Sequence, residues 1–207
     1  MTARQNISCH PEPSRGISNT AEIMIKPIYL YGAEVLRQKA APANIEDRDG
    51  ITALVQDLKD TLVRADGCGL AAPQIGVSLR VVIVDGDVVS DTYPYLKDFR
   101  RTIINPEILE ESEEAVTYSE GCLSIPGIYC DVVRPKKIKL RYYNEEFVQV
   151  TEEFDNFAAR MIQHELSHLD GDLFTDHAAP IRRKMISSKL QGIQRGKVHP
   201  HYNSKLK

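Results

Sequence analysis

The stretch QHELSHLDG, residues 163–171, places His164 and His168 four positions apart, with Glu165 directly after the first histidine. Side chains four positions apart lie on the same face of a helix, so both imidazoles can bind one metal ion. A catalytic metal of this kind usually has three protein ligands and one open position. The pattern therefore predicts a catalytic metal site whose third ligand lies elsewhere in the chain.

The large classes of zinc protease place their third ligand downstream of such a pair. One class uses a downstream glutamate, but the chain contains no glutamate after Glu165. Another class has a glycine and then a histidine; Gly171 is present, but Phe174 occupies the histidine position. The remaining candidates for the third ligand are Asp172, Asp176 and His177 downstream, and Cys122 upstream in EGCLSIPG. If Cys122 is the ligand, its thiolate and the two imidazoles would accept Zn²⁺, Fe²⁺, Ni²⁺ or Co²⁺.

Length and composition fit a soluble protein with one core. The chain has 207 residues and a net charge of −3, which gives no indication of a nucleic-acid-binding protein. It contains no run of about eighteen apolar residues, so we expect no membrane segment. The spacing of Cys9, Cys68, Cys122 and Cys130 fits neither a zinc ribbon nor a disulfide scaffold. We therefore expect a reducing compartment, the cytoplasm.

The composition changes abruptly at Met24. Residues 1–23 are rich in Ser, Pro and Asn and lack both apolar periodicity and the apolar core of a secretory signal. We expect 1–23 to be a disordered N-terminal extension whose deletion leaves stability and activity intact. Residues 24–195 are expected to form the catalytic domain, and 196–207 a basic C-terminal tail.

The elements that must position the metal site can be predicted from periodicity. Helical spacing of apolar residues predicts a helix over 49–65. The segment that carries the histidines is predicted to be a second helix, capped by Asp155 or Asn156, running to about Leu169 and closed by Gly171. A last helix is expected over 180–194. A buried strand is predicted at 79–85 and a series of strands over 101–154, with breaks at 67–76 and 86–100. This order indicates an α+β fold with mostly antiparallel strands around the His164–His168 helix. The apolar residues of the first helix are Ile51, Leu54, Val55, Leu58, Leu62 and Val63.

Three blocks, GCGLAAPQIG (67–76), EGCLSIPG (120–127) and QHELSHLDG (163–171), occur together and in this order. In combination they resemble peptide deformylase, and the resemblance extends over about 24–195. That family removes the formyl group from N-formylmethionine at the start of new bacterial polypeptides. The resemblance implies that Cys122, His164 and His168 hold one divalent metal per chain, with Fe²⁺ favoured and Zn²⁺, Ni²⁺ or Co²⁺ possible.

The resemblance also assigns roles around the metal. Glu165 directly follows a ligand, so its carboxylate can act as general base and then protonate the leaving amine. The side-chain amide of Gln74 and the backbone N–H of Leu123 would stabilise the oxyanion. Gly69 would let the substrate backbone approach closely, and Gly67 would shape the same turn.

Other residues near the site follow from the same comparison. The backbone near Gly69 and Tyr129 would pair with an extended substrate. Glu120 would border the substrate site while pairing with Arg134. Arg160 and Met161 lie one turn before His164 and would border the methionine pocket, although Met161 also fits the core.

Two positions depart from the family pattern. Ser167 stands where an aspartate is typical between the two histidines. An aspartate there could accept a hydrogen bond that supports the metal ligands, and a serine is a weaker acceptor. Cys68 stands where valine or isoleucine is common, and it fits either a small core residue or an oxidation-sensitive thiol.

The residues from Arg182 to Lys207 include eight lysines or arginines and no acidic residue. They fit a solvated helix face with a loose tail, or a contact with ribosomal RNA. The expected partners are thus N-formylmethionyl peptides and nascent chains, with possible ribosome contact and no membrane, and the protein is expected to be a monomer. The alternatives are a metalloprotease and a homologue that acts only as a ribosome-associated binding module.

Overall fold

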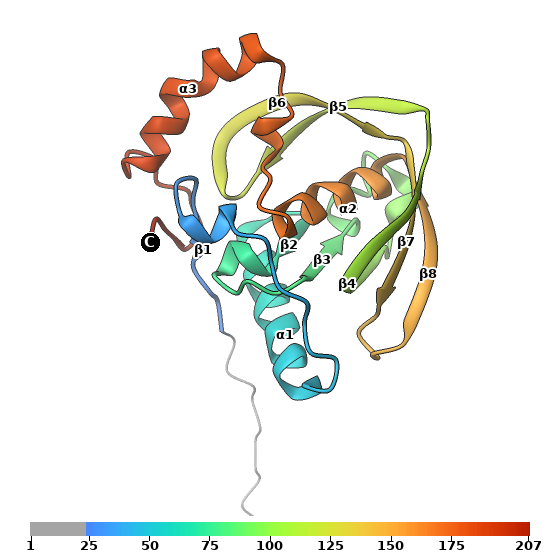
Figure 1. Ribbon diagram of the computed structural model, residues 1–207. Helices are drawn as coiled ribbons and strands as arrows, with labels where there is room; N and C mark the ends of the chain where they lie inside the picture. The colour runs from blue at the N-terminus through green and yellow to red at the C-terminus, as the bar shows by residue number, and fades with distance from the viewer. Residues whose placement is uncertain (1–23) are drawn as a thin grey trace, which may run out of the picture.

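The computed structural model describes residues 24–207 (Figure 1), so the predicted extension at 1–23 lies outside the described residues. The helices are α1 (Arg48–Ala65), α2 (Asn156–Leu169) and α3 (Pro180–Gln194). The strands are β1 (Ile28–Tyr29), β2 (Gly69–Ala71), β3 (Val81–Asp85), β4 (Arg100–Glu111), β5 (Ala115–Cys122), β6 (Ile125–Pro135), β7 (Lys137–Tyr143), β8 (Gln149–Asp155) and β9 (Ser204–Lys205).

The strands form one large sheet and two small ones. The five-stranded sheet has the order β2-β3-β4-β7-β8, with every neighbouring pair antiparallel. The β5–β6 hairpin forms a separate two-stranded sheet, and β1 pairs with β9 in parallel. The predicted α+β class with mostly antiparallel strands is therefore confirmed.

Helix α2 passes through the middle of the molecule, with the β5–β6 hairpin on one side and the large sheet on the other (Figure 1). Its inner residues, from Ala158 to Leu169, are nearly all buried, including charged ones. Gly171, at φ +77°, ends the helical segment as predicted, and a Cβ there would lie 2.7 Å from the Arg37 carbonyl oxygen. Asp155 occupies the N-cap position, but its side chain makes no capping hydrogen bond. Since α2 carries both histidines, burial on all sides fixes their direction.

Helix α1 packs against β2 and β3 through the predicted apolar face. Asp47 caps it by accepting a hydrogen bond from the Gly50 N–H at 3.1 Å. The prediction that Val63 belongs to the buried face is wrong, because its side chain is 81% exposed while Leu62 is buried. Adjacent helical residues point about 100° apart, so both cannot face the sheet.

Residues 67–76 were expected to interrupt regular structure, but Gly69–Ala71 form β2, the edge strand of the large sheet. The prediction failed because a strand of only three residues is too short to show an alternation of polar and apolar side chains. A 3₁₀ turn at Ala72–Ile75 follows and buries Gln74.

The C-terminal segment after α3 does not trail from the domain. Strand β9 pairs with β1, and Tyr202 is buried against α1, β2 and β3. Val198 and Leu206 pack against a third apolar cluster, under α3 and β6. The expectation of a loose tail therefore does not describe these residues, because a count of charges overlooks the apolar side chains between them.

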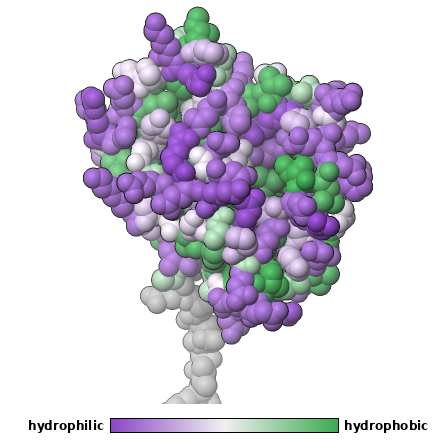
Figure 2. Space-filling view, in the orientation of Figure 1, coloured by the Kyte–Doolittle hydropathy of each residue, from purple (hydrophilic) through white to green (hydrophobic). Residues whose placement is uncertain are grey.

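The face of the molecule in Figure 2 is mostly hydrophilic, with hydrophobic side chains in small separate patches. Among the described residues, the helices are too short or too polar for any of them to cross a lipid bilayer.

Candidate metal centre

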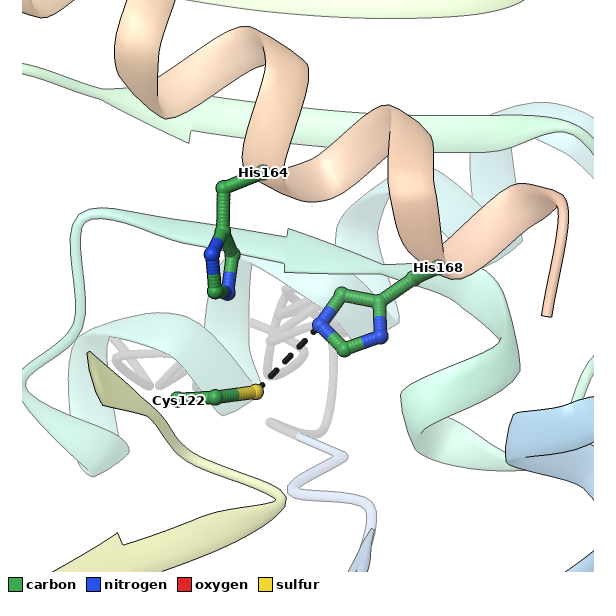
Figure 3. A group of neighbouring side chains, drawn as sticks. All are labelled: Cys122, His164 and His168. Atoms are coloured by element: carbon green, nitrogen blue, oxygen red, sulfur yellow. Dashed lines mark hydrogen bonds between the residues drawn. The ribbon is translucent and has the colours of Figure 1, made fainter. Parts of the chain in front are cut away.

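Cys122, His164 and His168 converge on one point (Figure 3). Their possible ligand atoms all lie within 4.8 Å of one another, and the Cys122 Sγ is 3.3 Å from the His168 Nε2. Of the open candidates for a third ligand, Cys122 is therefore the one that joins the histidines. Asp176 instead forms an ion pair with Arg37.

Local structure explains how Cys122 reaches the histidines. It is the last residue of β5, and the pairing with β6 shifts register between Glu120 and Cys122. Such an irregularity redirects a side chain relative to the regular strand. The two histidines project from α2 four residues apart, as their spacing predicted.

A buried ionic network supports His164. The His164 Nδ1 lies 2.8 Å from the Glu120 Oε2, which leaves Nε2 as the nitrogen available to a metal. Arg134 donates to both Glu120 oxygens, at 2.8 and 3.0 Å, and Arg160 donates to Oε1 at 2.6 Å. Burial alone would raise the pKa of Glu120, but the hydrogen bonds from His164 and Arg134 hold it well below its ordinary value. A thiolate and two imidazoles, one fixed by a carboxylate, form a donor set that fits a divalent transition metal.

The structure gives Glu120 and Arg160 more contacts than the sequence indicated. The Glu120–Arg134 pair was expected, but the Glu120 carboxylate also accepts from His164 and Arg160. Arg160 was expected to border the methionine pocket, and its guanidinium additionally donates to the Val132 and Val116 carbonyl oxygens. Both residues line the cavity described below, while their charged groups bind each other.

Glu165 is buried beside this group and lies directly over β2. A Cβ on Gly69 would lie 2.5 Å from the Glu165 Oε1, so position 69 has no room for a side chain. The substrate backbone was expected to approach Gly69 closely; in the structure the group that lies close to Gly69 is the Glu165 carboxylate. The Glu165 Oε2 is buried without a hydrogen-bond partner among the described residues, and burial raises the pKa of this carboxyl to about 7.

Gln74 and Leu123 flank Cys122. The Gln74 Oε1 accepts from the Ala71 N–H at 2.8 Å, which fixes the amide. Its Nε2 then donates to the Ser124 Oγ at 3.2 Å and faces the Cys122 Sγ at 3.5 Å. Leu123 begins the turn from β5 to β6, and its side chain packs over Gly67, where a Cβ would lie 2.9 Å away.

A cavity of about 590 Å³ opens onto these groups. Its apolar lining includes Val88, Val89, Phe157 and Met161. Met161 also belongs to the core between α2 and the large sheet, so both of its expected roles fit. His168 is buried and does not line the cavity formed by the described residues. The predicted site residues that line the cavity are Gly67, Gly69, Gln74, Glu120, Cys122, Leu123, Tyr129, His164 and Glu165.

The two departures from the family pattern have defined surroundings. The Ser167 Oγ accepts from Arg134 at 2.9 Å and donates to the Gln163 carbonyl oxygen, so it acts on the network through Arg134. Cys68 packs against the core and lines the cavity, and burial raises its pKa to about 11, which keeps the thiol protonated.

Some cavity residues had no signal in the sequence. Val88 and Val89 belong to the segment 86–100, which was expected to be only a polar loop. Pro200, His201 and Tyr202 come from the C-terminal segment. These contacts join positions distant in sequence, so spacing cannot reveal them.

Comparison with known proteins gives a consistent result. A family model described as polypeptide deformylase matches residues 25–184. A peptide deformylase of Flavobacterium psychrophilum is 42% identical over 190 residues, covering 88% of this chain and 97% of that protein. One of Chlorobium phaeobacteroides is 42% identical over 179 residues, covering 86% and 94%. The crystal structure of a peptide deformylase from Legionella pneumophila has a TM-score of 0.73 and 36% identity, covering 84% of this chain and 97% of that one.

The family match at 25–184 includes every block that surrounds the Cys122, His164 and His168 group. The structural similarity is accompanied by substantial sequence identity, so it indicates common function as well as fold. The chain belongs to the polypeptide deformylase family, the metal-dependent hydrolases that remove the N-formyl group from nascent peptides.

Proposed function

We propose that Cys122, His164 and His168 bind the divalent metal and that Glu165 carries the proton during deformylation. The observation that supports this assignment best is the Glu165 carboxylate, whose Oε2 is buried and unpaired among the described residues. A buried carboxylate without a partner is costly, and such a cost is typical of a group held ready for chemistry. It lies in the wall of the same cavity as Cys122 and His164.

The metal, when bound, would lower the pKa of a water molecule and polarise the formyl carbonyl. The thiolate and imidazole donors suit Fe²⁺, our proposed metal, and also Zn²⁺, Ni²⁺ or Co²⁺. Glu120, by accepting from His164 Nδ1, would keep Nε2 directed at the metal.

Glu165 would accept a proton at a carboxylate oxygen from the attacking water and return it to the amine of the leaving peptide. A general acid–base group works best when its pKa lies near the working pH. Burial raises the pKa of Glu165 to about 7, so the group can both accept and release a proton near neutrality.

Gln74 and Leu123 would stabilise the negative charge that develops on the formyl oxygen. The Gln74 amide is fixed by the Ala71 N–H, and its Nε2 points toward Cys122 and the adjacent turn. Donors fixed before the reaction are worth about 3 kcal/mol each. The backbone N–H of Leu123 would supply the second donor.

The cavity would accept an extended formyl-methionyl peptide. The apolar wall of Val88, Val89, Phe157 and Met161 offers a place for the methionine side chain. Gly67, Gly69 and Tyr129 also line the cavity, where backbone groups could pair with the peptide. The exposed Tyr129 ring packs over Gly121, where a Cβ would lie 2.6 Å away.

Formate release from formyl-Met-Ala-Ser tests the assignment. Protein prepared without oxygen and loaded with Fe²⁺ or Ni²⁺ should release formate, and Glu165→Ala should lose about 10²- to 10⁴-fold in rate. Glu153→Ala, which removes an exposed carboxylate on β8, is the matched control and should behave like the wild type. A Glu165→Ala protein that binds one metal per chain and keeps full activity would contradict the role of Glu165.

The exposed basic residues of α3 are our proposed contact with the ribosome, which would place the enzyme in the cytoplasm with nascent chains. Arg183, Lys184 and Lys189 are exposed there, whereas Arg182 donates to the Tyr129 carbonyl oxygen. Binding through phosphate neutralisation should weaken with salt. Cosedimentation with ribosomes should therefore fall on replacing the three exposed residues by glutamine; binding insensitive to both changes would reject the contact.

We also propose that the protein acts as a monomer. All of the candidate metal ligands and the Glu165 carboxylate come from one chain, so the site needs no second copy. Sedimentation equilibrium should give a mass near 23.3 kDa.

A further inference from the structure

The C-terminal segment reaches the wall of the active-site cavity. After α3 the chain turns back, and its end lies beside β1 (Figure 1). Pro200, His201 and Tyr202 line the same cavity as Gln74, Cys122 and Glu165. The segment is therefore close enough to influence the reaction, although it is the last part of the chain.

Tyr202 bonds to the backbone of Leu123, whose N–H is one of the proposed oxyanion donors. Its side chain is only 9% exposed and packs in the cluster formed by α1, β2 and β3. From there the Tyr202 hydroxyl donates to the Leu123 carbonyl oxygen at 2.5 Å. This bond joins residues 79 positions apart.

The turn that Tyr202 contacts is held at two further points. The Ser124 carbonyl oxygen accepts from the Tyr31 N–H at 2.8 Å, and the Ser124 Oγ accepts from Gln74. Gln74 and Leu123 are the two proposed oxyanion donors, so the bonds that fix this turn also fix the donors relative to each other.

Backbone pairing anchors the segment that carries Tyr202. The Ile28 N–H donates to the Asn203 carbonyl oxygen at 2.9 Å, and the Leu30 N–H to that of Lys205 at 2.8 Å. The Lys205 ammonium lies 4.2 Å from the centre of the Tyr29 ring. Because the residues directly after the tyrosine are bonded to β1 and its ring is buried, its hydroxyl has little freedom to leave Leu123.

We propose that Tyr202 is a positioning residue for deformylation, whose hydroxyl holds the Leu123–Ser124 peptide so that the Leu123 N–H and the Gln74 amide meet the developing oxyanion together. The inference rests on the proposed roles of Leu123 and Gln74. Donors of this kind act through fixed geometry, so a loosened turn weakens catalysis more than substrate binding.

Tyr202→Phe tests the inference, because it removes one hydroxyl and keeps the buried ring. The matched control is Tyr143→Phe, which removes the hydroxyl of a half-buried tyrosine packed on the same cluster. For Tyr202→Phe we expect kcat to fall about five- to tenfold, as for a lost hydrogen bond of about 1 kcal/mol, with KM changed less than about twofold. Metal content should equal that of the wild type, and the control should keep the wild-type kcat.

A kcat of Tyr202→Phe equal to that of Tyr143→Phe would overturn the inference, as would a fall matched by lost metal. Hydrogen–deuterium exchange over residues 121–126 gives a second readout that needs no activity, and Tyr202→Phe should exchange faster there than the control. Failure of wild-type protein to release formate would reject the proposed function, and the exchange rates would still decide whether Tyr202 holds the turn. Equal exchange in both variants would reject that contact.

Discussion

Arginine and glutamate side chains pair in two regions of this protein with opposite surroundings. Beneath His164, the side chains of Glu120, Arg134 and Arg160 are at most 9% exposed. On the large sheet, Arg141 of β7 pairs with Glu107 of β4, and these side chains are 43% and 58% exposed. Water can replace a lost partner on the sheet, but it cannot do so beneath His164. The same pair of residue types should therefore contribute little to stability on the sheet and a large amount beneath His164.

The largest effect in this comparison should come from Glu120→Gln. The change leaves Arg134 and Arg160 buried without a counter-charge and should cost about 3–5 kcal/mol of unfolding free energy. The folded pKa of Glu120 is depressed, so its contribution is present above its unfolded pKa and is lost as pH falls toward the folded pKa. The difference between wild type and variant should therefore shrink on acidification below about pH 4.5. Chemical denaturation of the metal-free proteins at several pH values measures this difference in unfolding free energy. A loss below about 1 kcal/mol at pH 7 would mean that the buried network stabilises the protein no more than an exposed ion pair does.

Glu165→Gln should have the opposite sign, because Glu165 is buried and forms no ion pair with any residue of 24–207. The folded pKa of about 7 lies above the unfolded value, so the folded state holds the proton longer and stability falls as pH rises between the two. Above pH 7 nearly the full cost is present, and the neutral glutamine should stabilise the metal-free protein by about 3 kcal/mol at pH 8. At pH 4 the two proteins should unfold at the same denaturant concentration. A variant less stable than the wild type at pH 8 would show that the carboxylate has a partner in solution.

Ser167→Ala should give an intermediate effect. The serine hydroxyl accepts a hydrogen bond from Arg134, and its loss should cost about 1 kcal/mol. The comparison that sharpens this prediction is Ser112→Ala, because Ser112 is half-buried like Ser167 but its hydroxyl bonds the backbone of Glu114 and Lys137 instead of a buried arginine. A Ser167→Ala protein as stable as Ser112→Ala would mean that Glu120 and the Gln163 carbonyl oxygen hold Arg134 without help from the serine hydroxyl.

Glu107→Gln should have the smallest effect. It removes the carboxylate of an exposed pair, so the expected cost is about 0.2–1 kcal/mol and should decrease further as salt is added. Denaturation at low and high ionic strength measures both quantities. A salt-independent loss as large as that of Glu120→Gln would erase the distinction between the two regions.

The sequence could predict those parts of the site that lie on one regular element. His164, Glu165 and His168 share α2, whose start, end and spacing follow from local patterns. The helix at Pro180–Gln194 and the strand series over 101–154 were likewise predictable from periodicity and turn residues. The resemblance to a family supplied Cys122, Gln74 and Leu123, whose positions no local rule connects to the histidines.

What the sequence determined by itself was the chemistry available: a paired histidine motif, a cysteine at a strand end, and an α+β chain with one core. Only the tertiary structure decided which groups meet. It joined Arg160 to Glu120 and brought Tyr202 to Leu123 from 79 residues away. It also buried the Glu165 Oε2 with no partner in the part of the chain that the structure describes. The physical reason is that backbone periodicity sets the direction of nearby side chains, whereas distant contacts depend on how the apolar clusters pack. Burial, which sets the charge state of Glu120 and Glu165, exists only once that packing is complete.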